Sequence, residues 1–302
     1  MTEQALVDLL TRLDASCSGR LGVAAHRLGA DEKVRWHDED RFRTASTVKV
    51  AIHAAVMAKV RAGHLDLDRR VPLRLTDLVG GAGVLNVLRP GIEPTLADLC
   101  TLMIVISDNT ATNLVIDLVG GVDAVNGALA DLGFGEVVLQ RRLAYPPPPL
   151  VAGPRPAPGG PIGTFATATP ASLCRLVAAI EAGAVVDPTA SRLMFDTLAH
   201  QHFQSGVARS FLEITEPGGT PDRWPAVANK TGEVAGCRAE VGVMALPGGT
   251  RIAYAVMADD LADTTLTSLS EGNELLGRVG AALLRRWWQG PGAPPLRPGS
   301  PY

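Results

Sequence analysis

The stretch at residues 42–58, FRTASTVKVAIHAAVMA, most constrains what this chain can fold into. One side of a helix at this stretch would be apolar, because hydrophobic residues recur at i, i+4, i+7 and i+8, at Val48, Ile52, Ala55 and Val56. The opposite side is also apolar, with Val50, Ala54 and Met57. A helix that is apolar nearly all round is a buried helix, so the other elements must pack around it.

This helix also carries a lysine, Lys49, with Ser46 three residues before it. Residues at i and i+3 share a helix face, so the hydroxyl and the amine could meet. Burial and the positive end of a helix both lower the pKa of an amine, which could then take the proton of Ser46 and make it a nucleophile. Taken alone, the pattern is more often a serine that caps a helix and a lysine that reaches solvent, so the rest of the chain must decide.

Composition narrows the class of protein. The chain has 302 residues, 46% hydrophobic and 20% charged, which is ordinary for a globular protein with a large core. A formal charge of −3 provides no basic field for nucleic acid or an anionic membrane, and no apolar run approaches the roughly 18 residues of a membrane span. We therefore expect a small-molecule substrate, no nucleic-acid or membrane partner, and a monomer or weak oligomer.

Residues that could bind metal or form disulfides are scattered. The four cysteines form no CxxC pair, and His200-Gln201-His202 has no further ligand cluster near it in the sequence. The sequence therefore implies no metal or organic cofactor, and we expect the cysteines to be free and buried. The first residues carry an acid where a signal peptide carries positive charge, so we expect a cytoplasmic protein.

The order of elements predicts an α+β fold. Strand patterns occur near both ends of the chain, at residues 20–28, 33–37, 227–230, 240–246 and 252–258. Helix patterns occupy residues 2–14, 95–105, 110–118, 123–132, 170–182, 191–199 and 270–288. The simplest assembly is one antiparallel sheet flanked by the terminal helices.

Two lobes follow from this assembly. Residues 1–43 and 211–290 would form a discontinuous α/β lobe, and residues 44–210 an all-helical lobe. A Pro/Gly-rich loop at residues 145–161 should be more mobile than the helices around it, and residues 291–302 should be a disordered tail. A ligand would bind in the cleft between the lobes.

Three polar clusters need a common explanation. Ser46-Thr47-Val48-Lys49 opens the central helix, and Ser107-Asp108-Asn109 separates two helices. Lys230-Thr231-Gly232 lies on a strand, where glycine lets a ligand approach the backbone. Each cluster alone is weak evidence, but the three in this order, with these spacings, form a known catalytic signature.

With these motifs, the chain resembles the serine β-lactamases and penicillin-binding proteins, and the class A β-lactamases in particular. The resemblance extends over residues 20–288 and includes the stretches TASTVKVAIHAAVM, LMIVISDNTATNLVI and NKTG. It implies the fold of that superfamily, with the active site between the sheet and the helical lobe.

The resemblance also implies roles for eight residues. Ser46 would be acylated, Lys49 would be its base, and Ser107 would relay a proton to the leaving group. Asn109 would hold the amide side chain of the substrate, and Lys230 and Thr231 would bind its carboxylate, beside Gly232. The backbone N–H groups of Ser46 and Glu233 would form the oxyanion hole.

The chain departs from the class A pattern in the loop that supplies the deacylation base. Class A enzymes have a glutamate there, whereas this chain has Gln140-Arg141-Arg142-Leu143-Ala144-Tyr145-Pro146 and no acid from 137 to 180. Glu136 lies nearby at the wrong spacing. Cys100 resembles one half of a disulfide found in some members, but its partner position is His53.

These features predict a serine hydrolase that forms an acyl-enzyme on an ester, amide or β-lactam carbonyl, as a poor β-lactamase with esterase-type activity. Two alternatives stay open. One is a homologue that binds a β-lactam or another ligand without hydrolysing it, and the other is an enzyme like the DD-peptidases.

Overall fold

The computed structural model describes residues 1–146, 164–210 and 226–288. Most of the proline-rich loop expected at residues 145–161 therefore lies outside the described residues. So do residues 211–225 and 289–290 of the predicted α/β lobe and the predicted tail at 291–302. The lobe boundaries and the mobility of the loop stay predictions.

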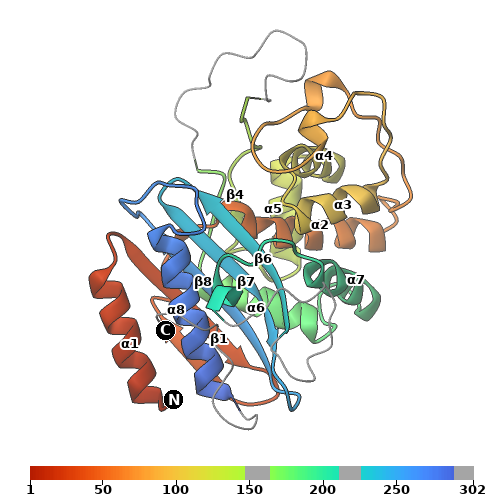
Figure 1. Cartoon of the computed structure of the whole chain (residues 1–302). Coiled ribbons are helices and arrows are strands. Elements are labelled where there is room, and N and C mark those ends of the chain that lie inside the picture. Colours follow the sequence, from red (N-terminus) through yellow and green to blue (C-terminus); the bar gives the residue numbers. More distant parts are fainter. Residues whose placement is uncertain (147–163, 211–225, 289–302) are drawn as a thin grey trace.

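A five-stranded antiparallel sheet forms the body of the molecule, with the order β2-β1-β8-β7-β6. It joins strands from the two ends of the chain, as expected (Figure 1). The strands are β1 (Arg20–Arg27), β2 (Glu32–Trp36), β6 (Ala226–Val234), β7 (Cys237–Ala245) and β8 (Arg251–Asp259). Strand β6 lies at an edge, so one side of its backbone has no strand partner in the sheet.

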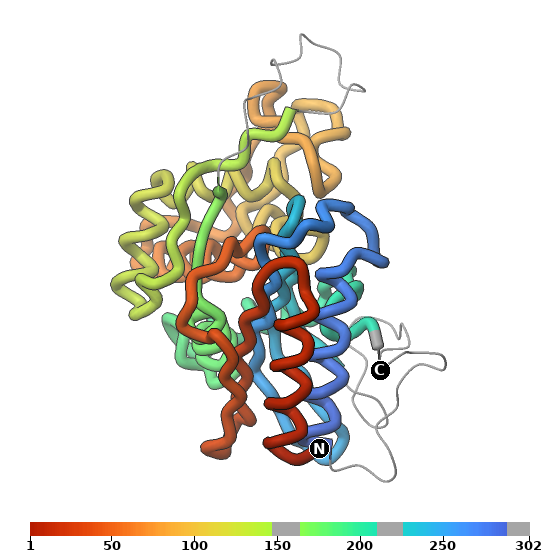
Figure 2. Tube along the Cα trace, turned by 90° about the vertical axis from the view of Figure 1, so that its left-hand side faces the viewer, coloured from red at the N-terminus to blue at the C-terminus, as the bar shows by residue number. Residues whose placement is uncertain are grey.

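Two terminal helices cover one face of the sheet. Helices α1 (Glu3–Ser16) and α8 (Glu271–Trp287) run side by side against it (Figure 2). Thr2 and Ser270 cap their first turns with side-chain oxygens. Their apolar faces enclose one hydrophobic core with the strands, including Leu6, Leu10, Tyr254, Val279 and Leu283.

The remaining helices lie on the other face and beyond it. Helix α6 (Pro170–Glu181) packs directly on the sheet (Figure 1). A second hydrophobic core continues from there into the helical region. The other helices are α2 (Lys49–Arg61), α3 (Leu96–Val105), α4 (Asn109–Val119), α5 (Val122–Asp131) and α7 (Pro188–Ala199). Helix α2 is central, since residues 49–57 are all buried.

The central helix starts later than its sequence pattern indicates. Residues 42–43 form a short strand, β3 (Phe42–Arg43), and Ser46 lies in a 3₁₀ turn, η1 (Ala45–Val48). Strand β3 belongs to a three-stranded sheet with the order β3-β5-β4, which the sequence analysis missed. Its other strands, β4 (Val138–Leu139) and β5 (Ala166–Ala168), are too short to show a periodic pattern.

Other expectations can be compared with the described residues. The four cysteines are free as expected, and three are buried, but Cys17 is only half-buried because it follows the end of α1. No group of three His, Cys, Asp or Glu side chains in the described ranges could hold a metal ion. No single helix there is long and apolar enough to cross a membrane, although the pair α4 and α5, bent by 72°, passes that test.

Candidate active site

Ser46 lies where the central helix meets the edge strand of the large sheet. It is half-buried, whereas the residues on both sides of it are buried. A Cβ atom on Gly232 of β6 would lie 2.7 Å from the carbonyl oxygen of Thr44 and 3.0 Å from the backbone nitrogen of Ser46. Only glycine therefore fits at this position, and β6 passes directly against the turn that carries Ser46.

Lys49, the first residue of α2, is fully buried and has three acceptors. Its ammonium donates to the carbonyl oxygen of Ser107 at 2.8 Å, to Ser107 Oγ at 3.1 Å and to Asn109 Oδ1 at 2.9 Å. Ser46 is not among the hydrogen-bond partners that the described residues provide. The expected pairing of Ser46 with Lys49 is therefore replaced by contacts from Lys49 to the second polar cluster.

The environment of Lys49 disfavours its charged form. Burial lowers the pKa of this amine well below its usual value, and the nearby positive charge of Lys230 lowers it further. Asp108 acts in the opposite direction and does not offset the loss of water. A buried amine with a lowered pKa has the property required of a general base.

The turn between α3 and α4 is fixed by Asp108, which is fully buried. Its carboxylate caps α4 through the N–H of Ala111 at 2.9 Å and accepts the N–H groups of Val84 and Leu85 at 2.7 and 2.8 Å. Ser107 consequently has φ of 58°, a left-handed conformation that a serine adopts only under constraint. This constraint places both oxygen atoms of Ser107 on Lys49.

Asn109, at the start of α4, is buried and uses both ends of its side-chain amide. Its oxygen accepts from Lys49, and its nitrogen donates to the carbonyl oxygen of Gly80 at 2.9 Å. Asn109 therefore connects the Lys49 amine to the segment at residues 80–85. In this arrangement Asn109 positions Lys49, and its contact with the substrate stays a prediction.

Lys230 lies on the edge strand β6 with its side chain fully buried. Its ammonium donates to the carbonyl oxygen of Thr231 at 2.7 Å. Burial lowers the pKa of Lys230 to about 7, and the opposite charge of Glu240 limits the decrease. Thr231 is half-buried beside it, so the strand edge next to the turn of Ser46 carries an amine and a hydroxyl.

Glu233 and Arg238 form an ion pair at the end of β6 that the sequence analysis missed. The two residues are register partners, and Arg238 Nη2 lies 3.0 Å from Glu233 Oε1. Arg238 is buried and also donates to the carbonyl oxygens of Val234 and Cys237 at 2.9 and 2.8 Å. This arginine fixes the end of the strand whose Glu233 N–H is the predicted oxyanion donor. A single Arg in an apolar strand gives no sequence signal of such a role.

The stretch 140–146 packs on α4. The side-chain amide of Asn113 donates to the carbonyl oxygen of Leu143 at 2.8 Å and accepts the Leu143 N–H at 3.0 Å. Asn113 is one helical turn beyond Asn109, on the same face of α4. Leu143 is buried, so an apolar side chain occupies the part of this stretch that is most firmly held.

Neither Glu136 nor His53 takes part in the site. Glu136 pairs with Arg175 of α6 at 2.6 Å, on the surface. His53 is buried in α2, and burial alone lowers its pKa to about 4, so it is a neutral core residue. Cys100 is free, as expected from the absence of a cysteine at position 53.

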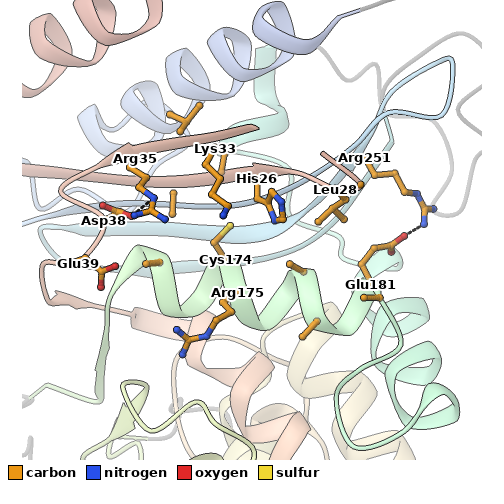
Figure 3. Close-up of a pocket in the computed structure, with 18 of the residues that line it drawn as sticks. His26, Leu28, Lys33, Arg35, Asp38, Glu39, Cys174, Arg175, Glu181 and Arg251 are labelled. Atoms are coloured by element: carbon orange, nitrogen blue, oxygen red, sulfur yellow. Dashed lines mark ion pairs between the residues drawn. The ribbon is translucent and has the colours of Figure 1, made fainter. Parts of the chain in front are cut away.

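A large groove lies elsewhere, between α6 and strands β1 and β2, with a volume of about 880 Å³ (Figure 3). Small residues of α6 line its floor, including Ala171, Cys174 and Ala178. Its cationic side chains already contact carboxylates, in the pairs Lys33–Asp31, Arg35–Asp38, Arg175–Glu136 and Arg251–Glu181. Burial raises the pKa of the Cys174 thiol to about 12, so the groove contains no activated nucleophile from that residue.

A half-buried serine in the turn before a buried helix, a buried amine with a lowered pKa and an edge strand together define the architecture of a serine hydrolase. The family described as the β-lactamase enzyme family matches residues 3–287, and the chain belongs to it.

Solved structures agree with this assignment. A β-lactamase from Sphaerobacter thermophilus is 33% identical, with a TM-score of 0.77, and the match covers 94% of this chain and 97% of that one. A variant of the class A β-lactamase of the last common ancestor of Gram-negative bacteria is 26% identical, with a TM-score of 0.76 over 94% and 98% of the two chains. The protein PBP-A, at 22% identity, has the same fold, with a TM-score of 0.75 over 92% and 94%.

Proposed function

We propose that the protein is a serine hydrolase that forms an acyl-enzyme at Ser46, with an ester, amide or β-lactam carbonyl as the electrophile. The observation that carries this proposal is the fully buried Lys49, held by Ser107 and Asn109 three residues after a half-buried serine. Among the described residues, Lys49 has no carboxylate in an ion pair with it, and its side chain is buried, so its burial has a cost that catalysis would explain.

In the proposed acylation step, Lys49 in its neutral form accepts the proton of Ser46. The serine oxygen attacks the carbonyl carbon, and the negative charge on the substrate oxygen is stabilised by the N–H groups of Ser46 and Glu233. The bond from this carbon to nitrogen or oxygen then breaks. The leaving atom takes a proton through Ser107, whose hydroxyl lies 3.1 Å from the Lys49 ammonium.

Lys230 and Thr231 are the proposed anion site for a substrate that carries a carboxylate. Lys230 has a pKa of about 7, so it binds an anion best below neutral pH and loses its charge as the pH rises. A bound anion would itself favour the charged amine. Uncharged esters do not need this contact.

Hydrolysis of the acyl-enzyme is the step for which this chain has no evident base. The stretch on α4 presents Leu143, and the sequence has no acid from 137 to 180. A penicillin acylates Ser46 as its ring C–N bond breaks, and its leaving group stays attached to the acyl-enzyme, so this acyl-enzyme should clear slowly. An ester loses its leaving group, and Lys49, once neutral again, can activate water, so esters should turn over faster.

Pre-steady-state kinetics with nitrocefin and with p-nitrophenyl acetate test this proposal, together with intact-protein mass spectrometry. We expect a burst and a slow steady state with nitrocefin, and sustained turnover of the ester. Rapid, burst-free nitrocefin hydrolysis would contradict the missing base. Acylation without turnover of either compound would indicate the non-hydrolytic alternative, and release of alanine from a D-Ala-D-Ala peptide would indicate the peptidase alternative.

A further inference from the structure

Glu240 on β7 is a fully buried carboxylate that the proposed chemistry does not use. It accepts hydrogen bonds from the Tyr254 hydroxyl at 2.8 Å, from Asn229 Nδ2 at 2.8 Å and from the backbone N–H of Val207 at 2.9 Å. All three partners are donors. Since only an ionised carboxylate accepts at both oxygens without donating, this arrangement is built for a negative charge.

This cluster lies directly behind the predicted anion site. Asn229 precedes Lys230 in β6, and Glu240 is the register partner of Thr231. Lys230 and Glu240 therefore occupy adjacent positions on neighbouring strands, and their side chains point to opposite faces of the sheet. Both are fully buried, so their charges interact with less screening than charges at the surface.

From this geometry we propose that Glu240 is a positioning residue that keeps Lys230 protonated, and so able to bind the carboxylate of an anionic substrate, at neutral pH. The inference rests on the proposed function of Lys230 and deepens it, because it makes preference for anionic acyl donors depend on a residue that no substrate touches. Tyr254 and Asn229 hold the carboxylate in place.

Other charged and titratable groups lie near Lys230 and Glu240 and affect the charges of the pair. Lys49 is the like charge that faces Lys230 from α2, and Asp108 offsets Lys49 from the start of α4. The pKa of Glu240 is raised, because burial outweighs the opposite effects of its three hydrogen-bond donors and of Lys230. Turn η4 (Val207–Ser210) packs near this cluster and carries Arg209, and Tyr254 is the titratable group that faces Glu240 from β8.

The chain offers a direct measurement, because it contains only four lysines, Lys33, Lys49, Lys59 and Lys230. Biosynthetic ¹³C labelling of lysine at Cε gives four resonances, and that of Lys230 is assigned with the variant Lys230→Met. We expect Glu240→Gln to lower the pKa of Lys230 by about one unit, corresponding to about tenfold less protonated lysine at pH 8. Tyr254→Phe is the matched control, because it removes a hydrogen bond from the same cluster and keeps the carboxylate.

Acylation rates provide the functional readout. Penicillin G carries a carboxylate, so in Glu240→Gln its acylation rate should begin to fall at a lower pH than in wild type. At pH 8 the rate should be about tenfold below that of wild type. Acylation by uncharged p-nitrophenyl acetate should be unchanged. A purely structural role would slow both compounds equally and leave the titration of Lys230 in place.

The outcomes separate this inference from the proposed function. An unchanged Lys230 titration in Glu240→Gln overturns the inference, and so does an equal decrease in Tyr254→Phe. A wild-type protein that neither compound acylates overturns the proposed function, while the resonance of Lys230 still decides the role of Glu240. If Glu240→Gln does not fold, the double variant Glu240→Met/Tyr254→Phe leaves fewer buried polar groups unpaired and carries the same test.

Discussion

Two regions contact the first turns of α4, one through Asn109 and the other through Asn113, and they differ in chemical content. The region formed by Lys49, Ser107, Asn109 and Lys230 is buried, polar and closely hydrogen-bonded. The region formed by residues 140–146 is held to α4 as firmly, through Asn113, but the residue held there is a buried leucine, Leu143. The backbone of each region is held in place by hydrogen bonds. The second region, residues 140–146, lacks an acidic side chain that could activate water. The difference predicts that formation and hydrolysis of the proposed acyl-enzyme have different requirements.

The largest effect is expected from Ser46→Ala, which removes the proposed nucleophile. Labelling by penicillin and by an activated ester should be lost, because the oxygen proposed to form the acyl bond is then absent. Intact-protein mass spectrometry gives the result, with Ser16→Ala as a control serine far from the site in sequence. Undiminished labelling of the Ser46→Ala protein would place the acyl group elsewhere and break the comparison between the two regions.

Lys49→Arg is expected to reduce the acylation rate by about 10²–10⁴-fold, the range of general-base assistance. Arginine keeps the positive charge but stays protonated at accessible pH, so it cannot accept the proton of Ser46. Single-turnover kinetics with p-nitrophenyl acetate provide the measurement, and Lys49→Ala is the comparison. If arginine supported acylation near the wild-type rate, charge alone would explain the need for Lys49.

Leu143→Glu tests the other region by adding the missing acid. A carboxylate on this fixed backbone should increase the hydrolysis of a penicilloyl-enzyme by about 10²-fold, at the lower end of the range for a positioned base. Decay of the acyl-enzyme mass after penicillin treatment measures this rate. Leu143→Gln has similar size without the charge, so an equal gain in both variants would mean that loosening of the stretch, and not a base, is responsible.

The sequence was sufficient to predict the large sheet, the two terminal helices that cover it and the three polar clusters. Periodicity marked α1 and α8, and the clusters carry chemistry that few other arrangements of residues explain. The family match confirms the fold and the superfamily. The roles of individual site residues stay predictions, although the structure brings the three clusters together.

What the sequence could not provide depends on contacts between distant residues. Nothing near Lys49 in the chain indicates that its acceptors are Ser107 and Asn109 and not Ser46. Strand β3 has two residues, too few for a pattern, and it delays the start of the helix. Glu240 looks like an interruption of an apolar strand until Asn229, Tyr254 and Val207 are seen around it.

The smallest effect is expected from Arg142→Ala, which alters the attachment of the second region at its surface. Arg142 Nη2 lies 2.9 Å from Asp117 Oδ2 of α4, with both side chains about half exposed (49% and 46%). Ion pairs in such positions contribute at most about 1 kcal/mol to stability, because water and salt screen them.

Asn113→Ala is the contrasting variant. It leaves the buried backbone N–H and carbonyl groups of Leu143 unpaired, and each unpaired group should cost about 1–3 kcal/mol of stability. Urea unfolding of both variants, at low and at high salt, measures the difference. A loss of stability in Arg142→Ala as large as that in Asn113→Ala would show that residues 140–146 are held by the surface ion pair and not by the buried amide of Asn113. The backbone of Leu143 would then be less rigid than its contacts indicate, and Leu143→Glu would place its carboxylate less firmly.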